Sequence, residues 1–302
     1  MTSNRASDQQ VLPALPFDSW KDTQATLHMW AQIVGKVRLK LSPLENHWWN
    51  VPFYLTARGM TTSPMPYGGG TVEILFDFID HKLVIETNDG RADTMPLTAQ
   101  SVAQFYKKFM ALLAELGVMA KIWTLPCELP DPIPFEKDTI HAAYDAEAAH
   151  KFWRILAWVD PVLKEFRTGF IGKVSPVHFF WGSFDLAVTR FSGRVAPDRP
   201  GADSITREAY SHEVSSAGFW PGGGDIKAPA FYSYAAPEPI GFAERRVLPA
   251  AAYYHPQMKE FLLGYDDVRT AADPRKVLLD FLQSTYDAAA DLGKWDRKAL
   301  ER

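Results

Sequence analysis

The 302-residue chain is long enough for one or two domains of roughly 150 residues, each with its own core. Lysine and arginine total 32 against 36 aspartate and glutamate, which gives a formal net charge of −4 and no long basic run. Binding to nucleic acid is therefore not expected, because nothing in the sequence would neutralise a series of phosphates. No apolar stretch approaches the ~18 residues that would span a bilayer, so no membrane insertion is expected.

The cysteine content and the first residues bear on the cellular compartment. Cys127, the only cysteine, cannot form an intramolecular disulfide. Met1–Arg5 is polar and lacks the apolar core of a secretory signal peptide. We therefore expect a soluble cytoplasmic protein, with residues 1–14 forming a disordered N-terminal tail.

The most distinctive feature of the sequence is a set of landmarks that occurs twice in the same order. In each run, a histidine followed by two aromatic residues leads to a glycine triplet and then to a helix that ends in an acidic residue, leucine and glycine. The first run consists of His47-Trp48-Trp49, Gly68–Gly70 and Glu115–Gly117, and the second of His178-Phe179-Phe180, Gly222–Gly224 and Asp291–Gly293. We interpret this recurrence as an internal duplication, in which the second copy carries an inserted segment near residues 193–220.

The spacing of apolar residues predicts the elements of a first half, residues 15–125. A helix is expected to begin near Ser19 and to stop at Gly35. Val37, Leu39 and Leu41 alternate with charged residues, as in a strand with one wet face. His47–Arg58 alternates in the same way and predicts a second strand.

The rest of the first half reads as a hairpin followed by a helix. Thr71–Ile79 and Leu83–Thr87 are expected to pair across a turn at residues 80–82. A helix over Thr98–Leu116 carries one apolar stripe, and Gly117 suits the left-handed conformation that ends many helices.

Prolines separate this half from the next one. Four of them fall within residues 126–134, where missing amide donors oppose regular structure, so residues 126–141 are predicted to be a linker. Residues 142–302 then repeat the plan as a second half. Its expected elements are a helix near Asp145–Val159 stopped by Pro161, strands near Val177–Thr189 and Ala230–Tyr234, and a helix near Pro274–Leu292.

This order of elements predicts an α+β fold. We expect two related halves, each built as helix, antiparallel strands and helix, with the helices packed on one face of the sheet. Parallel βαβ alternation is absent from the pattern.

Four segments carry a resemblance to a known family. They are His28-Met29-Trp30, Pro176–Asp185, Tyr210–Pro221, and Phe231–Tyr234 together with Pro237-Glu238-Pro239. In these segments the chain resembles the bacterial domain-of-unknown-function family 5996, over about Leu15 to Leu292. The resemblance implies no activity, because that family has no chemistry to carry over residue by residue.

Two histidines are expected to be structural. His47 and His178 share the parity of core residues along their predicted strands, which favours a buried imidazole with a single hydrogen bond. Asp185 falls on the opposite face from His178 in this interpretation, and pairing the two would require a bulge at Gly182.

The inserted segment has the residue types of acid/base catalysis. Asp203 or Ser204 would cap a short helix over Ile205–Val214, with Glu208 beside His212 at i,i+4. An imidazole, carboxylates and a phenol near aromatic residues suit proton transfer, although a solvated surface helix would have a similar composition. The candidate catalytic residues are His212, Glu213, Glu208, Tyr210, Asp185 and Arg190, and the candidate ligand-binding walls are Trp181, Phe219, Trp220 and Tyr232.

Other chemistries have weaker support in the sequence. No spacing typical of a zinc site is present, no metal site is predicted, and no cofactor can be named. The leading hypothesis is a small-molecule enzyme whose cleft lies between the halves. The alternatives are a non-catalytic module that binds a small ligand or peptide, and a structural or interaction protein. The sequence does not decide whether the protein is an enzyme or what its oligomeric state is.

Overall fold

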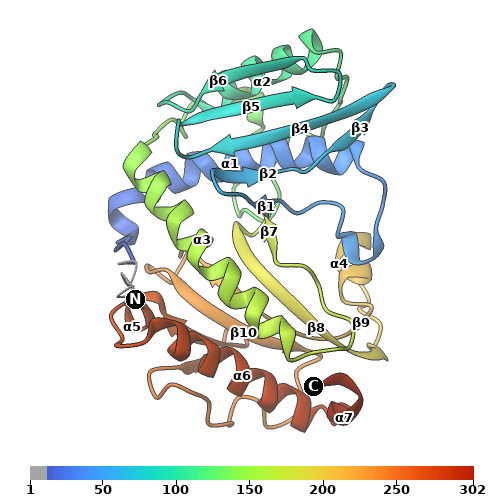
Figure 1. Ribbon diagram of the computed structural model, residues 1–302, viewed down its shortest axis with the longest axis vertical. Helices are drawn as coiled ribbons and strands as arrows, with labels where there is room; N and C mark the ends of the chain where they lie inside the picture. Colours follow the sequence, from blue (N-terminus) through green and yellow to red (C-terminus); the bar gives the residue numbers. More distant parts are fainter. Residues whose placement is uncertain (1–11) are drawn as a thin grey trace, which may run out of the picture.

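The computed structural model describes residues 12–302, which form two antiparallel sheets of six strands each (Figure 1). The first sheet has the order β1-β2-β4-β5-β6, with β3 paired to β4. Its strands are β1 (Tyr54–Leu55), β2 (Gly59–Thr61), β3 (Met65–Tyr67), β4 (Gly70–Asp77), β5 (Lys82–Thr87) and β6 (Ala92–Pro96). The second sheet has the order β11-β12-β10-β9-β8-β7. Its strands are β7 (His178–Phe180), β8 (Asp185–Val195), β9 (His212–Trp220), β10 (Ala230–Ala236), β11 (Tyr253–His255) and β12 (Glu260–Gly264).

Seven α-helices accompany the sheets within the described range. They are α1 (Phe17–Leu41), α2 (Val102–Glu115), α3 (Ala146–Thr168), α4 (Ser204–Ala209), α5 (Tyr265–Arg269), α6 (Pro274–Leu292) and α7 (Arg297–Leu300). Single 3-10 turns cover Asn46–Trp48 and Phe135–Lys137. The mixture of helices with antiparallel sheets confirms this part of the predicted fold class. None of the described helices is long and apolar enough to cross a membrane.

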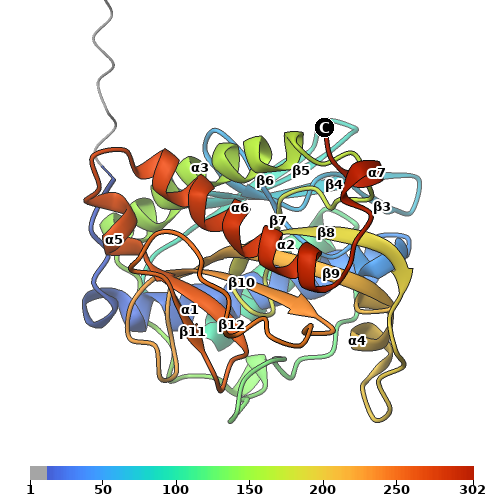
Figure 2. The same cartoon turned by 90° about the horizontal axis from the view of Figure 1, so that it is seen from below.

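The two sheets meet edge to edge. Phe53, beside β1, and Phe179 of β7 exchange backbone hydrogen bonds of 2.9 and 3.0 Å. Helix α3 contacts strands of both sheets across this junction (Figures 1 and 2). One cluster of buried apolar side chains extends through both halves and includes Leu12. Residues 1–11 of the expected tail lie outside the described residues.

The first helix is longer than predicted. α1 continues through Gly35, the expected stop, and contains Val37, Leu39 and Leu41, which were predicted to form a strand. Gly35 serves packing instead, because a Cβ atom there would lie 2.3 Å from the indole of Trp181. Because Gly35 has no side chain, the indole of Trp181 can pack directly against α1.

The predicted end of the next helix at Pro161 is also wrong. α3 continues through Pro161 to Thr168, although the proline removes one backbone hydrogen bond. Val162, Leu163 and Phe166 beyond it are buried, so tertiary packing outweighs the local cost.

Several local predictions are confirmed. β4 and β5 form the expected hairpin, and α6 has the predicted bounds. Gly117 adopts the predicted positive φ, 75°, just after α2, although that helix begins later than the predicted Thr98, at a capping box between Ser101 and Gln104.

The recurring landmarks occupy different places in the two halves. His47 lies in a 3-10 turn with a φ of 58°, whereas His178 begins β7, so the predicted strand at His47 is wrong. Gly68–Gly70 lies at the β3–β4 turn, and Gly222–Gly224 follows β9. The two histidines therefore lie in different local structures, whereas each glycine triplet lies in the connection between two paired antiparallel strands, and the duplication stays a prediction.

The predicted strand Val177–Thr189 is a hairpin of β7 and β8. Its register pairs His178 with Ala187 and Phe180 with Asp185. Side chains directly opposite each other point to the same face of an antiparallel pair. The prediction that Asp185 and His178 lie on opposite faces is therefore wrong, because the turn at residues 181–184 changes the parity.

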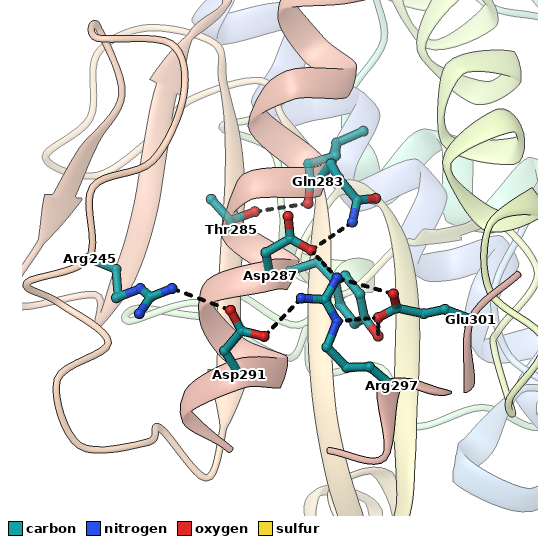
Figure 3. Close-up of polar contacts among 9 residues, drawn as sticks. Arg245, Gln283, Thr285, Asp287, Asp291, Arg297 and Glu301 are labelled. Carbon is teal, nitrogen blue, oxygen red and sulfur yellow. Dashed lines mark hydrogen bonds and ion pairs between the residues drawn. The ribbon is translucent and has the colours of Figure 1, made fainter. Parts of the chain in front are cut away.

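A cluster of ion pairs links α7 and Glu301 to α6 (Figure 3). Arg297 of α7 lies 2.6 Å from a carboxylate oxygen of Asp287, 2.8 Å from Asp291 and 2.7 Å from Glu301. The Tyr286 hydroxyl donates to Glu301 at 2.8 Å. This network holds α7 against the last turns of α6.

Candidate functional site

The face of the second sheet opposite α3 and α6 forms the floor of a groove. Thr189, Ser216 and Tyr234 lie side by side on neighbouring strands, and Ala187, Gly218 and Tyr232 form the adjacent row. Because side chains alternate between the faces of a strand, these two rows point away from the helices.

Two adjoining cavities occupy this groove. The smaller has a volume of about 630 Å³, and its further lining includes Arg199, Trp220, Glu238, Lys259, Glu260 and Leu262; we call it the acidic chamber. The larger has a volume of about 890 Å³, and its further lining includes Trp49, Phe180, Trp181, Phe191, Ile205 and Val214; we call it the aromatic chamber. Both chambers are lined by Ser183, Asp185, Tyr210, Tyr232 and Tyr234.

Helix α4 and the 3-10 turn of the first half contribute to the wall of the aromatic chamber. Asp203 caps α4 as predicted, accepting hydrogen bonds from the amides of Ile205 and Thr206 at 2.8 and 3.0 Å. Glu208 then ties α4 to the turn, since its Oε1 accepts from the His47 amide at 3.2 Å. The imidazole Nδ1 of His47 also lies 3.0 Å from the Glu208 carbonyl oxygen. The segment of residues 193–220 thus contacts the turn at Asn46–Trp48.

Asp185 and Tyr232 form the central contact of the groove. The Tyr232 hydroxyl donates to Oδ2 of Asp185 across the intervening strand. Gly218 on the intervening strand pairs with Tyr232, and a Cβ atom there would be 2.7 Å from the Tyr232 hydroxyl. The missing side chain at this position leaves room for the phenol to reach the carboxyl.

The second oxygen of this carboxyl is unpaired. Oδ1 of Asp185 is buried and has no hydrogen-bond partner among the described residues. Burial raises the pKa of Asp185 to about 7; Tyr232 opposes this change, and Glu128 and Glu260 add to it. A group with this pKa exchanges protons readily at neutral pH, as general acid/base catalysis requires.

A second carboxyl with a raised pKa lines the acidic chamber. Burial raises the pKa of Glu260 to about 7 as well. Glu128 lines the adjoining aromatic chamber, where it accepts a hydrogen bond of 2.8 Å from Ser183. The groove therefore concentrates carboxyl groups around Asp185.

Tyrosines border these carboxyls. The hydroxyl oxygens of Tyr210 and Tyr234 are 2.8 Å apart, and the rings of Tyr232 and Tyr234 stack with centroids 6.2 Å apart. Burial raises the pKa of both Tyr232 and Tyr234 well above 10, so they act as neutral donors. The Arg199 guanidinium lies 4.2 Å from the centroid of the Tyr210 ring.

The predicted helix over Ile205–Val214 ends early, which separates the histidine from its expected partners. α4 stops at Ala209, and His212 and Glu213 begin β9. His212 pairs in register with Val195, at the far end of β8 from Asp185, so these two residues do not converge. Glu213 instead forms an ion pair of 2.6 Å with Arg194.

Two other candidate residues point to the helix-covered face. Arg190 is buried, with its guanidinium carbon 3.5 Å from the ring centroid of Phe166 and 4.3 Å from that of Tyr286. Phe219 is fully buried in the main core and does not line either chamber. Their strand parity places them away from the groove.

Half of the candidate residues line the chambers, namely Asp185, Tyr210, Trp181, Trp220 and Tyr232. Trp181 is fixed by a hydrogen bond of 2.8 Å from its indole nitrogen to the carbonyl of Val51.

His178 is buried, as expected for a structural residue, but it lacks the expected hydrogen bond. Neither ring nitrogen has a partner among the described residues. The rings of Trp49, Tyr54 and Phe180 surround it at centroid distances of 5.3 to 5.7 Å. Burial lowers the pKa of His178 to about 3, and Arg38 and Arg167 add to this effect.

Sequence reasoning missed Tyr234 and Glu260. Tyr234 lies two residues from Tyr232 on the same predicted strand, so strand alternation alone would have placed both on one face. Glu260 belongs to β12, which was not predicted. No three His, Cys, Asp or Glu side chains within residues 12–302 are grouped so that they could hold a metal ion.

The comparisons with known proteins agree with the resemblance noted in the sequence. The model of a family of unknown function, DUF5996, matches residues 12–302. No curated protein and no solved structure matches the chain. The matched range contains both sheets and the whole groove, and the chain therefore belongs to the DUF5996 family.

Proposed function

We propose that the protein is an enzyme that acts on a small organic molecule bound in the groove, with Asp185 as the group that transfers a proton. The observation that carries this proposal is a buried carboxyl on the wall shared by both chambers, with one oxygen hydrogen-bonded and the other unpaired. Pockets of several hundred cubic ångströms with a few convergent polar groups are the usual form of small-molecule sites.

The surroundings of Asp185 suit a change of protonation state during a reaction. With a pKa of about 7, the carboxyl is close to half protonated at neutral pH. Tyr232 holds Oδ2, which leaves Oδ1 to exchange a proton with a ligand. Tyr232 is a positioning residue in this proposal.

This proposal replaces His212 as the catalytic residue. His212 and Glu213 lie at the other end of β9, and Glu213 is committed to Arg194 and to the Ser192 hydroxyl. Among the sequence candidates, Asp185, Tyr210 and Tyr232 keep a place in the site because they line the chambers.

The test is a turnover screen with small esters, amides and carbon acids, whose reactions require proton transfer. For any substrate that is converted, Asp185→Asn should lower kcat by about 100-fold or more, the usual size of a general acid/base contribution. The pH profile of kcat/KM should have an inflection near 7 in the wild type, from the pKa of Asp185.

Tyr232→Phe provides a readout that a structural role would not give. Removing the donor to Asp185 should move the inflection to higher pH, because that hydrogen bond favours the ionised carboxyl. Glu213→Gln is the matched control outside the groove and should keep the wild-type rate. Full turnover in a folded Asp185→Asn protein would contradict the assignment.

A non-catalytic binding module is the second candidate, favoured by the aromatic lining of the larger chamber. Trp49, Phe180 and Phe191 offer apolar surface there, and Trp220 lines the acidic chamber. A ligand that raises the Tm of the wild type but not of Trp220→Leu, with no turnover in either, would support this function instead.

A further inference from the structure

The acidic chamber combines buried carboxyls with an unpaired oxygen. Asp185 is 7% exposed and lines both chambers, and its Oδ1 has no partner among the described residues. Glu260 lines the same chamber and is half-buried. Burial disfavours the ionised form of each carboxyl, and a cation bound in the chamber would favour it.

Aromatic rings border the same space. Tyr232 and Tyr234 stack on the floor, and Trp220 and Tyr210 complete the lining. The faces of such rings carry partial negative charge and attract ammonium groups, most strongly where water is excluded. Carboxylates and aromatic faces together form the usual environment of a bound organic cation.

We propose, building on the proposed function, that the ligand is a primary or substituted organic amine whose ammonium group lies between Asp185 and Glu260 and whose apolar body extends into the aromatic chamber. The shared lining of the two chambers allows one molecule to occupy both. Trp49, Phe180 and Phe191 would cover the apolar body.

The cations of the acidic chamber are less buried than Asp185. Arg199 is half-buried and stacked on Tyr210, while Lys259 is exposed. Solvent screens charges at such positions, so the buried carboxyl of Asp185 dominates the field at the floor. Glu238, also in the lining, accepts a hydrogen bond from Tyr254 and offsets part of the positive charge.

Binding of an amine should release protons from the protein. Ammonium favours the ionised carboxyls, so affinity should rise as the pH increases towards the pKa values of Asp185 and Glu260, both about 7. The other ionisable groups that line the two chambers are His47, Cys127, Glu128, Arg199, Asp203, Glu238 and Lys259, together with the neutral tyrosines.

The experiment is isothermal titration calorimetry of the full chain with three probes of similar size: 2-phenylethylamine, 2-phenylethanol and 3-phenylpropionate. We expect the amine to bind about tenfold more tightly than the alcohol, which lacks the charge, and the carboxylate to bind most weakly. Titrations in buffers with different ionisation enthalpies should report proton release for the amine alone.

Three variants test which residues determine the preference for the amine over the alcohol. Glu260→Gln should reduce the preference for amine over alcohol without changing the affinity for the alcohol, because only the charge is removed. Glu213→Gln, outside the groove, should leave all three affinities unchanged. Phe191→Ala should weaken the amine and the alcohol equally, since it shortens the apolar wall that both would contact.

Equal binding of amine and alcohol, strongest binding of the carboxylate, or no binding of any probe would each overturn the inference. Binding and turnover are measured in separate experiments, so the amine ligand and the proposed catalysis can fail independently. An amine that binds and is not converted would support the inference and count against catalysis. Turnover of a neutral substrate with no amine binding would support catalysis and contradict the inference of an amine ligand.

Discussion

Each sheet buries one aspartate, and the two carboxyls have opposite surroundings. Asp77, at the end of β4 in the first sheet, is 2% exposed and accepts hydrogen bonds from Arg58 at 2.7 Å and from two turn amides at 2.9 and 3.0 Å. Asp185, at the start of β8 in the second sheet, is 7% exposed and receives one hydrogen bond, from Tyr232.

The pKa values move in opposite directions for this reason. Burial alone would raise the pKa of Asp77, but the hydrogen bonds from Arg58 and the turn amides outweigh it and lower the pKa. Burial of Asp185 is not compensated in this way, and its pKa rises to about 7. A fully hydrogen-bonded carboxylate stabilises a turn, whereas an incompletely paired carboxyl is free to exchange a proton.

The sheets also differ in what covers them. The second sheet packs α3 and α6 on one face and has the groove on the other. The first sheet contributes no lining residue between 54 and 96 to either chamber of the described structure. Its half supplies instead the loop at Trp48, Trp49 and Val51, which lines the aromatic chamber from the side.

The comparison predicts that Asp185→Asn stabilises the protein at high pH. The folded-state pKa of Asp185 is raised, so the native state holds a proton that the unfolded chain releases above about pH 4. Wild-type stability should fall as the pH rises from about 4 to about 7. Relative to the wild type, Asp185→Asn should gain up to about 4 kcal/mol over this range.

Urea unfolding followed by circular dichroism across this pH range measures the effect. A gain that does not depend on pH would show that the folded-state pKa of Asp185 is close to its unfolded value, and the contrast with Asp77 would fail.

A variant of His178 tests whether a buried imidazole without a hydrogen-bond partner among the described residues destabilises the folded protein at low pH. Its folded-state pKa is lowered to about 3, so the native state cannot take up the proton that the unfolded chain binds below about pH 6.5. Stability should therefore fall as the pH decreases from about 6.5. Between pH 7 and pH 4, the free energy of unfolding of His178→Leu should fall by about 3 kcal/mol less than that of the wild type. Denaturant titrations at the two pH values measure this difference. An unchanged acid loss would indicate a hydrogen-bonded or hydrated imidazole.

These contrasts also show what the sequence could predict about the fold. The bounds of α6, the β4–β5 hairpin and the cap at Asp203 depend on local signals, and all three are confirmed. Gly35 and Pro161 are local stop signals that packing overrides, because Trp181 occupies the space above Gly35 and apolar residues beyond Pro161 are buried. Such tertiary effects are invisible to a pattern of neighbouring residues.

The site was predictable in part for the same reason. Residue type indicated Asp185, Tyr232 and Trp220, since a carboxyl among aromatic residues is chemically distinctive. Strand parity misplaced Asp185, because the turn after β7 was not foreseen. Glu260 comes from a strand far along the chain, and only the sheet topology brings it to the same chamber as Asp185.

Asp77→Asn should have the opposite sign to Asp185→Asn. The variant loses the charge that Arg58 and the turn amides stabilise, at a cost of about 2 kcal/mol, discounted because Arg58 is 45% exposed. The folded-state pKa of Asp77 is lowered, so its contribution is complete above about pH 4 and is lost as the pH falls further. Thermal and urea unfolding at about pH 7 should show the loss, and turnover in the groove should not change apart from the lower stability. A stabilised Asp77→Asn protein would remove the distinction between the two sheets.

The smallest expected effect is that of Glu213→Gln. Glu213 pairs with Arg194, which is 47% exposed, and a solvated ion pair of this kind contributes within about 1 kcal/mol. The residue lies at the opposite end of β9 from Trp220, so binding of a ligand in the groove should not change. Tm and the calorimetric affinity for 2-phenylethylamine measure the two parts of this prediction. If Glu213→Gln abolished binding or turnover while Tm stayed constant, the functional residues would lie at the start of β9, beside His212, and the groove around Asp185 would be a structural feature.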